Sequence, residues 1–203
     1  MDRLAWSLLL ASGVLLAPPR AQAVHVGSPA PDFTATDTYG KTEQLSEYKG
    51  KFVVLEWHNR ECPYTKKHYS SGNMQALQKE WTGKGVVWFT VISSAPRQQG
   101  YVTAEAENAY VKQMKASPTA VLLDPTGKLG HLYSAKTTPD IFIINPQGIL
   151  IYDGAIDDKP TTDLEDIARA KNYVSAALEE AMAGKEVAVA TSRPYGCSVK
   201  YAR

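Results

Sequence analysis

The sequence predicts an α/β fold in which a central mixed β-sheet is flanked by helices. Unbroken apolar runs over residues 51–57 and 86–92 are typical of strands that are covered on both faces. A helical pattern lies between these runs, and this order of strand, helix and strand implies a parallel pair joined by a right-handed crossover. Further along, residues 141–144 and 149–153 flank a turn at residues 145–148, which predicts a β-hairpin.

The other expected elements complete the order β-α-β-α-β, followed by the hairpin and a closing helix. Met74, Leu77 and Trp81 recur at helical spacing, so we expect these side chains in the core. The sequence further predicts a strand over 34–38, a helix over 63–69, a second helix capped by Asn73, a helix over 104–115, a strand over 119–123, a helical turn over 128–135 and a long amphipathic helix over 163–183. One face of that last helix carries Leu164, Ile167, Val174, Ala177, Leu178 and Ala181.

The first 23 residues have the pattern of a signal peptide. Arg3 begins a short basic region, residues 4–17 form an apolar region, and Ala21-Gln22-Ala23 is a small-x-small cleavage signal. The apolar run is too short to span a bilayer comfortably. We therefore expect cleavage near Ala23 and a periplasmic or secreted protein. The alternative is that these residues form a buried N-terminal helix.

Residues 24–203 are expected to form one domain, because they contain no internal repeat and no inter-domain linker. That length is sufficient for a proper hydrophobic core. The whole chain has 22 Lys and Arg residues against 21 Asp and Glu residues. Such a near-neutral balance offers no electrostatic case for nucleic acid or an anionic membrane, so we expect neither as a partner.

Cys62 lies where the apolar strand gives way to a helix. Pro63 follows it, and proline is favoured at the first position of a helix, which makes Cys62 the expected N-cap. The free N–H groups of Tyr64 and Thr65 and the positive end of the helix dipole would then face the sulfur. Such surroundings favour the thiolate and lower the pKa of a cysteine. We therefore expect a reactive thiol at this junction.

Several motifs carry a resemblance to a known family. Cys62-Pro63-Tyr64-Thr65 resembles the active-site turn of thioredoxin-fold proteins, and Thr138-Pro139 resembles the cis-proline loop of that fold. With residues 140–148, Gly154-Ala155-Ile156-Asp157-Asp158 and Gly196-Cys197-Ser198-Val199-Lys200, they are similar to a peroxiredoxin-like branch of the redoxin superfamily, which includes alkyl hydroperoxide reductase and thiol-specific antioxidant proteins. The resemblance covers residues 24–203 and implies a thioredoxin-like fold with thiol-dependent peroxidase or thiol-disulfide oxidoreductase activity.

The resemblance assigns roles to individual residues. Cys62 matches the nucleophilic cysteine, and Pro139 matches the cis-proline that packs opposite it. The backbone of Thr138 matches the group that meets a substrate peptide or thiol. Glu56 matches a buried carboxylate that relays a proton beneath the thiol. The alternative for Glu56 is a carboxylate at the strand edge that faces solvent.

The sequence also departs from the family pattern. Thioredoxins carry a second cysteine where this chain has Thr65, and typical peroxiredoxins carry a threonine where it has Asn59. An amide at Asn59 can still hydrogen-bond a peroxide oxygen. The arginine that peroxiredoxins bring from a later strand has no counterpart between Arg97 and Arg169. These departures count against fast peroxidase chemistry and leave thiol reactivity intact. We expect the substrate to contact Asn59, Pro63, Thr65, Thr138 and Pro139.

Cys197 is the other cysteine of the chain, and two hypotheses for the role of the Cys62 and Cys197 pair stay open. As a redox partner, Cys197 would resolve the intermediate on Cys62, either in the same subunit or in the partner subunit of a homodimer. The reactants would be a small peroxide or a disulfide-bearing protein, and a thiol reductant protein. Alternatively, a structural Cys62–Cys197 disulfide would hold a non-catalytic binding module.

A third hypothesis is that the protein is a copper carrier in which His58 and His68 lie near Cys62. Soft-metal sites prefer more than one thiolate, and a second cysteine at close spacing is missing. We expect no metal site and no cofactor.

Overall fold

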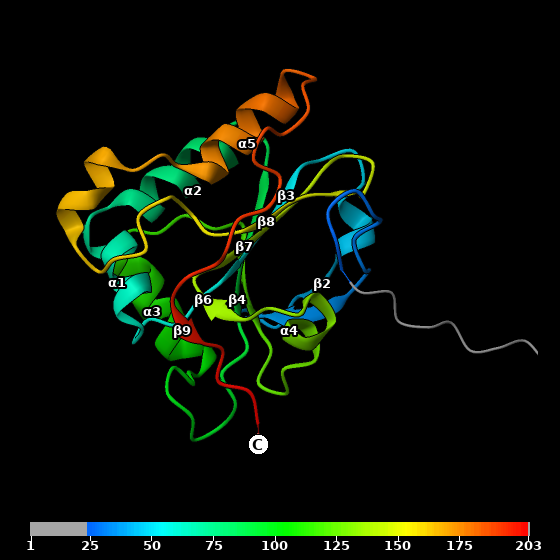
Figure 1. Cartoon of the computed structure of the whole chain (residues 1–203). Helices are drawn as coiled ribbons and strands as arrows, with labels where there is room; N and C mark the ends of the chain where they lie inside the picture. The colour runs from blue at the N-terminus through cyan, green and yellow to red at the C-terminus, as the bar shows by residue number, and fades with distance from the viewer. Residues whose placement is uncertain (1–23, 203) are drawn as a thin grey trace, which may run out of the picture.

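The computed structural model describes residues 24–202 and centres on a mixed β-sheet (Figure 1). In this part of the chain, the sheet has seven strands in the order β2-β1-β5-β4-β3-β7-β8. β3 is parallel to β4 and β4 to β5, while the other neighbours are antiparallel. The strands are β1 Thr34–Asp37, β2 Thr42–Gln44, β3 Val53–Trp57, β4 Val87–Ile92, β5 Ala120–Leu123, β7 Asp140–Ile144 and β8 Leu150–Gly154.

Helices cover both faces of the sheet (Figure 1). One face packs against four α-helices: α1 Pro63–Ser70, α2 Asn73–Gly83, α3 Ala104–Met114 and α5 Tyr173–Met182. The other face packs against α4 Lys128–Tyr133 and the 3₁₀ helix η1 Leu45–Tyr48. The arrangement is the thioredoxin-like fold that the sequence predicts, with a central mixed sheet between helices. In the described part of the chain, no helix combines the length and the apolar character needed to span a membrane.

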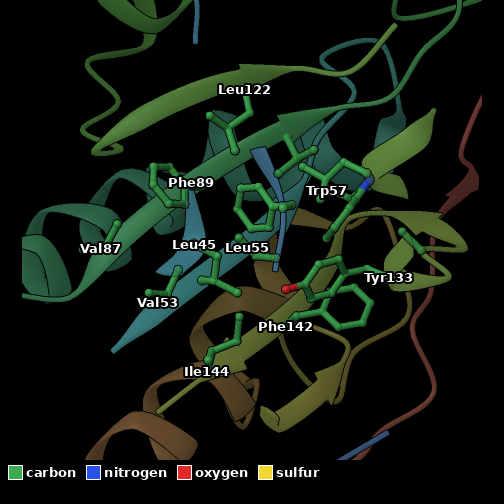
Figure 2. Close-up of a cluster of buried hydrophobic side chains, with 14 of the residues drawn as sticks. Leu45, Val53, Leu55, Trp57, Val87, Phe89, Leu122, Tyr133, Phe142 and Ile144 are labelled. Atoms are coloured by element: carbon green, nitrogen blue, oxygen red, sulfur yellow. The ribbon is translucent and has the colours of Figure 1, made fainter. Parts of the chain in front are cut away.

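Alternating side chains of β3 build the two halves of the core, as a strand buried on both faces requires. Val53, Leu55 and Trp57 point toward α4, and Val54 points toward α1 and α2. Near the end of β3, Phe142 stacks edge-on against Trp57 and Tyr133, with ring centroids 5.1 and 5.5 Å apart respectively (Figure 2). This aromatic cluster packs at the end of β3, just before the turn that leads to Cys62 and α1.

The predicted core positions and the parallel crossover are confirmed. Met74, Leu77 and Trp81 are buried on α2. The short strand β2 was not anticipated from the sequence, because its three residues pair only with β1 at the edge of the sheet. The expected signal peptide lies outside the described residues.

The prediction of one long helix over 163–183 is wrong. Residues Leu164–Arg169 form a 3₁₀ helix, η2, and α5 begins only at Tyr173. Between them the backbone turns back to pair with residues 156–158: Lys171 N–H donates to the Asp158 side chain at 2.9 Å, and Tyr173 N–H donates to Ile156 O at 2.8 Å. These bonds replace the intrahelical ones, and Leu164 stays about half exposed (49%).

The predicted cap of α2 is also wrong by one residue. Gly72 is the N-cap, with a left-handed backbone (φ 78°), and Asn73 is the first helical residue. The Asn73 side-chain amide instead bonds His68 Nδ1 at 2.9 Å. Gly72 joins α1 to α2 because a left-handed residue reverses the chain with little cost only when it lacks a Cβ.

Replacing Phe142 with alanine is expected to destabilise the protein by about 3–5 kcal/mol, because the change removes a buried ring and leaves a cavity. Urea unfolding measures this as a lower transition midpoint. Tyr39→Ala is the matched control, since the Tyr39 ring is 82% exposed. Equal midpoints for the two variants would contradict this account of the core.

Asp140 gives the fold a pH dependence. Burial raises the pKa of this carboxyl to about 7, and the hydrogen bond from Lys136 N–H, 2.9 Å from Oδ2, only partly offsets that effect. The unfolded carboxyl ionises near its ordinary pKa of about 3.9. Between these values the unfolded state binds fewer protons, so stability falls as pH rises, and the loss is complete above about pH 7.

We therefore expect Asp140→Asn to gain stability relative to the unchanged protein, by about 2–3 kcal/mol more at about pH 8 than at about pH 5. Denaturant unfolding at both pH values measures the difference. Asp163→Asn is the control, because Asp163 is exposed and asparagine preserves its capping role. A gain for Asp140→Asn that is the same at both pH values would show that burial of the charge is not its cause.

Candidate active site

The two cysteines lie side by side, although 135 residues separate them in the chain. Cys62 precedes α1, and Cys197 lies in the short strand β9 Cys197–Ser198 near the C-terminus. Their sulfurs are 2.7 Å apart, and both cysteines are free thiols. Figure 1 shows the tail returning across the molecule so that β9 runs beside β6, the strand Thr137–Thr138. The structure therefore brings together the two residues that the sequence singled out.

A turn built by Asn59 places Cys62 at the helix terminus. Asn59 Oδ1 accepts from Glu61 N–H at 2.9 Å, and Asn59 O accepts from Cys62 N–H at 3.0 Å. Gly100 lies against the same side chain, where any Cβ would come within 2.4 Å of it. Asn59 is therefore engaged in holding the turn. Its expected contact with substrate remains a prediction.

The cis-proline loop forms the other side of the site. The Thr138–Pro139 peptide bond is cis, and Thr138 O lies 3.0 Å from Cys62 Sγ. Thr138 also pairs with Cys197 in the antiparallel register of β6 and β9. Thr138 and Cys197 thus flank the Cys62 sulfur from one short ladder.

The surroundings of Cys62 favour its thiolate. Burial raises the pKa of Cys62, but four hydrogen bonds outweigh it, and the net pKa is lowered. These bonds involve the Cys197 thiol, the Thr65 amide, the Cys197 amide and the Thr138 side chain. Cys197 N–H lies 3.4 Å from Cys62 Sγ. Cys62 occupies the N-cap of α1, as the sequence predicts. The tail thus supplies two of the four hydrogen bonds that lower the pKa of Cys62.

Cys197 has the opposite electrostatic setting. Burial, its hydrogen bond to Cys62 and repulsion by the Cys62 charge raise the pKa of Cys197 to about 11, against a smaller lowering by Lys200. The two cysteines also differ in exposure: Cys62 is fully buried, whereas Cys197 is partly exposed. The two cysteines therefore differ in both respects: Cys62 is buried and has a lowered pKa, whereas Cys197 is partly exposed and has a raised pKa.

Residues of α1 and Asp157, which follows β8, anchor the tail two residues before Cys197. Tyr195 OH donates to Asp157 Oδ1 at 2.5 Å and lies 3.2 Å from His68 Nε2. Its ring lies against Tyr64, with centroids 5.8 Å apart, and Lys67 Nζ sits over the ring at 5.8 Å. The helix that follows Cys62 therefore supplies part of the anchor of Cys197, and Asp157 supplies the rest.

Sequence reasoning missed this anchor. Its members come from three distant segments. Tyr64 and Asp157 belong to motifs quoted above, and His68 belongs to the copper-carrier hypothesis, but no sequence pattern links them to Tyr195. Burial of His68 within the cluster lowers its pKa to about 4. The imidazole is therefore neutral near pH 7. A tyrosine two residues from a cysteine in the same extended tail was the available signal.

Glu56 is buried, so the solvent-facing alternative is excluded. Its carboxylate is surrounded by donors: Trp88 Nε1 at 2.8 Å, Tyr69 OH at 2.9 Å, Gln78 Nε2 at 3.1 Å and Thr90 Oγ1 at 3.2 Å. Among the described residues, no hydrogen bond joins Glu56 to Cys62. The structure therefore places Glu56 in a polar network that ties β3 to α1, α2 and β4, and its role as a proton relay stays a prediction.

Pro63 and Thr65 occupy different settings in the first turn of α1. Pro63 is exposed, whereas Thr65 is buried, and its Oγ1 has no hydrogen-bond partner in the described part of the chain. Of the two lysines that follow, Lys66 is exposed, and Lys67 is buried with Nζ donating to Lys159 O at 2.8 Å. The contacts of Pro63, Thr65 and Pro139 with substrate remain predictions.

The two histidines of the copper-carrier hypothesis lie in separate groups of polar side chains. His58 sits between Glu56 and Glu107, with its ring nitrogens 3.7 Å from a carboxylate oxygen of each. His68 belongs to the Tyr195 anchor. Within residues 24–202, no group of three or more His, Cys, Asp or Glu side chains has the arrangement of a metal site.

Known proteins share both the sequence pattern and the fold. The chain is 27% identical over 130 residues to the thiol-disulfide oxidoreductase ResA of Bacillus subtilis, which covers 64% of this chain and 67% of ResA. An uncharacterized conserved protein from Geobacillus kaustophilus superposes with a TM-score of 0.73 at 24% identity, covering 88% of this chain and 93% of that one. The thioredoxin domain of a thiol-disulfide oxidoreductase from Bacteroides vulgatus superposes with a TM-score of 0.50 at 20% identity, covering 72% and 97% respectively.

These likenesses agree with the site geometry, in which a cysteine at the start of a helix faces a cis-proline loop. The structural matches show the thioredoxin-like fold. The match to a family model is more specific, because it covers most of the chain. Residues 26–153 match the model of the AhpC/TSA family, and the chain therefore belongs to that family.

Proposed function

We propose that the protein is an exported thiol oxidoreductase in which Cys62 and Cys197 form one dithiol–disulfide couple within a single chain. The observation that carries this proposal is the 2.7 Å separation of the two sulfurs. A disulfide bond measures about 2.05 Å, so closing the bond requires only a small movement of β9. Membership of the AhpC/TSA family and the likeness to ResA support thiol redox chemistry. The leader pattern over residues 1–23 supports export.

Cys62 begins the reaction, because its lowered pKa gives it the larger thiolate fraction. With a peroxide, the thiolate attacks one oxygen, the O–O bond breaks, and the products are Cys62 sulfenic acid and the hydroxide or alkoxide that leaves with the bonding electrons. With a disulfide, the thiolate attacks one sulfur, and the products are a mixed disulfide on Cys62 and a released thiolate. Either product is one bond away from the internal disulfide.

Cys197 completes the oxidation. Its sulfur attacks the Cys62 sulfur, and the new S–S bond forms as water or the second thiolate leaves. Two of the three causes that raise the pKa of Cys197 come from Cys62, namely its hydrogen bond and its charge. Because both causes end when Cys62 becomes a neutral sulfenic acid or mixed disulfide, Cys197 loses its proton more readily at that step. The first reaction thus prepares the second.

An external thiol then reduces the couple through Cys197. That sulfur is partly exposed, whereas Cys62 is buried, so the thiolate of a reductant protein reaches Cys197. Attack there expels Cys62 as a thiolate. Exchange is faster when the leaving thiol has the lower pKa, and Cys62 has the lower pKa of the pair. The second thiol of the reductant then attacks the mixed disulfide and releases Cys197.

The groups that surround the Cys62 sulfur suit either oxidant, a peroxide or a disulfide. Arg60 does not take the place of the family's arginine, because its Nη1 donates to Ala106 O at 3.3 Å and lies 3.9 Å from Glu107. The thiolate is held instead by amides and by the Cys197 thiol. These donors stabilise a thiolate for either reaction, so peroxide reduction and disulfide exchange both belong to the proposal.

A structural Cys62–Cys197 disulfide in a binding module is the second candidate, and the same short distance favours it. Closing so long a loop would stabilise the fold by about 4–5 kcal/mol in the chain-entropy model. The opposite pKa shifts of the two cysteines favour the redox couple over the structural disulfide. A permanent disulfide contains no thiolate, so a lowered cysteine pKa would not contribute to its role. The two predictions below decide between them.

Cys62→Ser is expected to abolish peroxide consumption and disulfide exchange, because the attacking sulfur is lost. Cys197→Ser is expected to accept one oxidising equivalent and stop, with a sulfenic acid or an external mixed disulfide trapped on Cys62. Dimedone labelling and intact mass measure the trapped species. Ser198→Ala, which changes the exposed neighbour of Cys197, is the control and should cycle normally. Full turnover by Cys197→Ser would contradict the resolving role.

Ultraviolet absorbance of the thiolates in the reduced protein is expected to rise in two separate steps with pH. The first step belongs to Cys62 and falls at a lower pH than for an ordinary cysteine, because hydrogen bonds to its sulfur lower its pKa. The second belongs to Cys197 and falls near pH 11. The Cys62→Ser variant should lose the first step, and its remaining step should move to lower pH because the Cys62 charge is gone. A single step at the ordinary pKa for both cysteines would contradict the proposed nucleophile.

A further inference from the structure

The tail of the chain occupies the position that a cysteine-bearing peptide would need. Cys197 pairs with Thr138 in antiparallel register, and its sulfur lies 2.7 Å from Cys62 Sγ. An extended peptide that adds to a strand edge makes the same main-chain bonds. If its cysteine is to reach Cys62, its sulfur must stand where Cys197 Sγ stands. One strand edge and one sulfur position cannot serve two chains at once.

The tail is held at this position by contacts on both sides of Cys197. Before it, Tyr195 bonds to Asp157 and His68. After it, Val199 N–H donates to Lys136 O at 3.0 Å, and Tyr201 OH donates to Ala135 O at 2.8 Å. The strand therefore lies along the whole cis-proline loop and is not a loose end that happens to approach it.

Gly196 shows how closely the tail lies against the loop. Its backbone has φ +145°, and a Cβ at this position would stand 2.1 Å from Thr138 O. Only glycine allows this approach, because a backbone oxygen cannot give way as a flexible side chain does. A single methyl group at residue 196 would therefore lift the tail from the loop.

Beneath the tail, Cys62 is fully buried. A peroxide needs only a small opening to touch the sulfur, whereas a protein disulfide must bring a length of backbone with it. We propose that the docked tail determines the substrate class: it admits small oxidants such as hydroperoxides to Cys62 and excludes cysteine-bearing peptides and proteins. This inference rests on the proposed function, since it requires Cys62 to be the attacking thiol.

The test compares two oxidants on variants that all carry Cys197→Ser, so that only Cys62 reacts. One oxidant is hydrogen peroxide. The other is a short extended peptide whose cysteine is bonded to thionitrobenzoate, which is released as a coloured thiolate when Cys62 attacks the peptide sulfur. Intact mass identifies the sulfenic acid, trapped with dimedone, or the peptide adduct. The readout is the ratio of the peptide rate to the peroxide rate, which cancels any change in the reactivity of the thiolate itself.

Adding Gly196→Ala is expected to raise this ratio by about tenfold. The ratio rises by that factor when the tail is undocked in about one molecule in ten before the substitution and in nearly every molecule after it. Adding Tyr195→Phe, which removes the anchoring hydroxyl without a clash, is expected to raise the ratio in the same direction and by less. It supplies the answer if the alanine variant fails to fold. Adding Gly83→Ala is the control, because a Cβ there meets nothing within 4 Å.

An unchanged ratio in both loosened variants, with Cys62 still reactive, would overturn the inference and leave the proposed function standing. Rates that rise equally for both oxidants would also overturn it, because the tail would then be a cover without size selection. No reaction of Cys62 with either oxidant in any variant would overturn the proposed function, and this inference with it.

Discussion

The pairing of β9 with β6 is the contact on which the chemistry of this protein depends. A ladder only two residues long brings a C-terminal cysteine to a thiol at the N-terminus of α1. Without that ladder, Cys62 would lose two of the four hydrogen bonds that lower its pKa, because the Cys197 thiol and the Cys197 amide both belong to the tail. The tail thus supplies the second redox centre and activates the first.

The fold meets the cost of burying a charged sulfur in a specific way. Desolvation is the largest single effect on the pKa of Cys62, and it opposes the thiolate. Hydrogen bonds overcome it, and they come from the helix terminus on one side and the tail on the other. The rest of the site prepares this position: the Asn59 turn sets the helix start, and the Trp57, Tyr133 and Phe142 cluster supports the strand behind it. Each of these features serves to place one sulfur.

Local patterns were sufficient to predict the central strands and the junction at Cys62, whereas the cis-proline loop was expected from the family resemblance of Thr138-Pro139. Apolar runs and a proline after a cysteine report on their own neighbourhoods, so a single sequence reveals them. The break at residues 170–172 escaped, because the bonds between Lys171 and Asp158 that cause it join segments whose pairing leaves no periodic signal. The Tyr195 anchor escaped for the same reason. Cys197 was identified as a candidate by counting cysteines, whereas its contact with Cys62 follows only from the path of the tail.

The central claim is that Cys62 and Cys197 form one reversible redox couple within a single chain. Equilibration in glutathione buffers of graded potential, with each cysteine followed separately by alkylation and peptide mapping, tests it most directly. Because the lowered pKa of Cys62 stabilises the reduced form, we predict one shared two-electron midpoint above about −300 mV, in a protein that stays monomeric on a non-reducing gel. Separate midpoints, covalent dimers, or a shared midpoint well below that value would contradict the account.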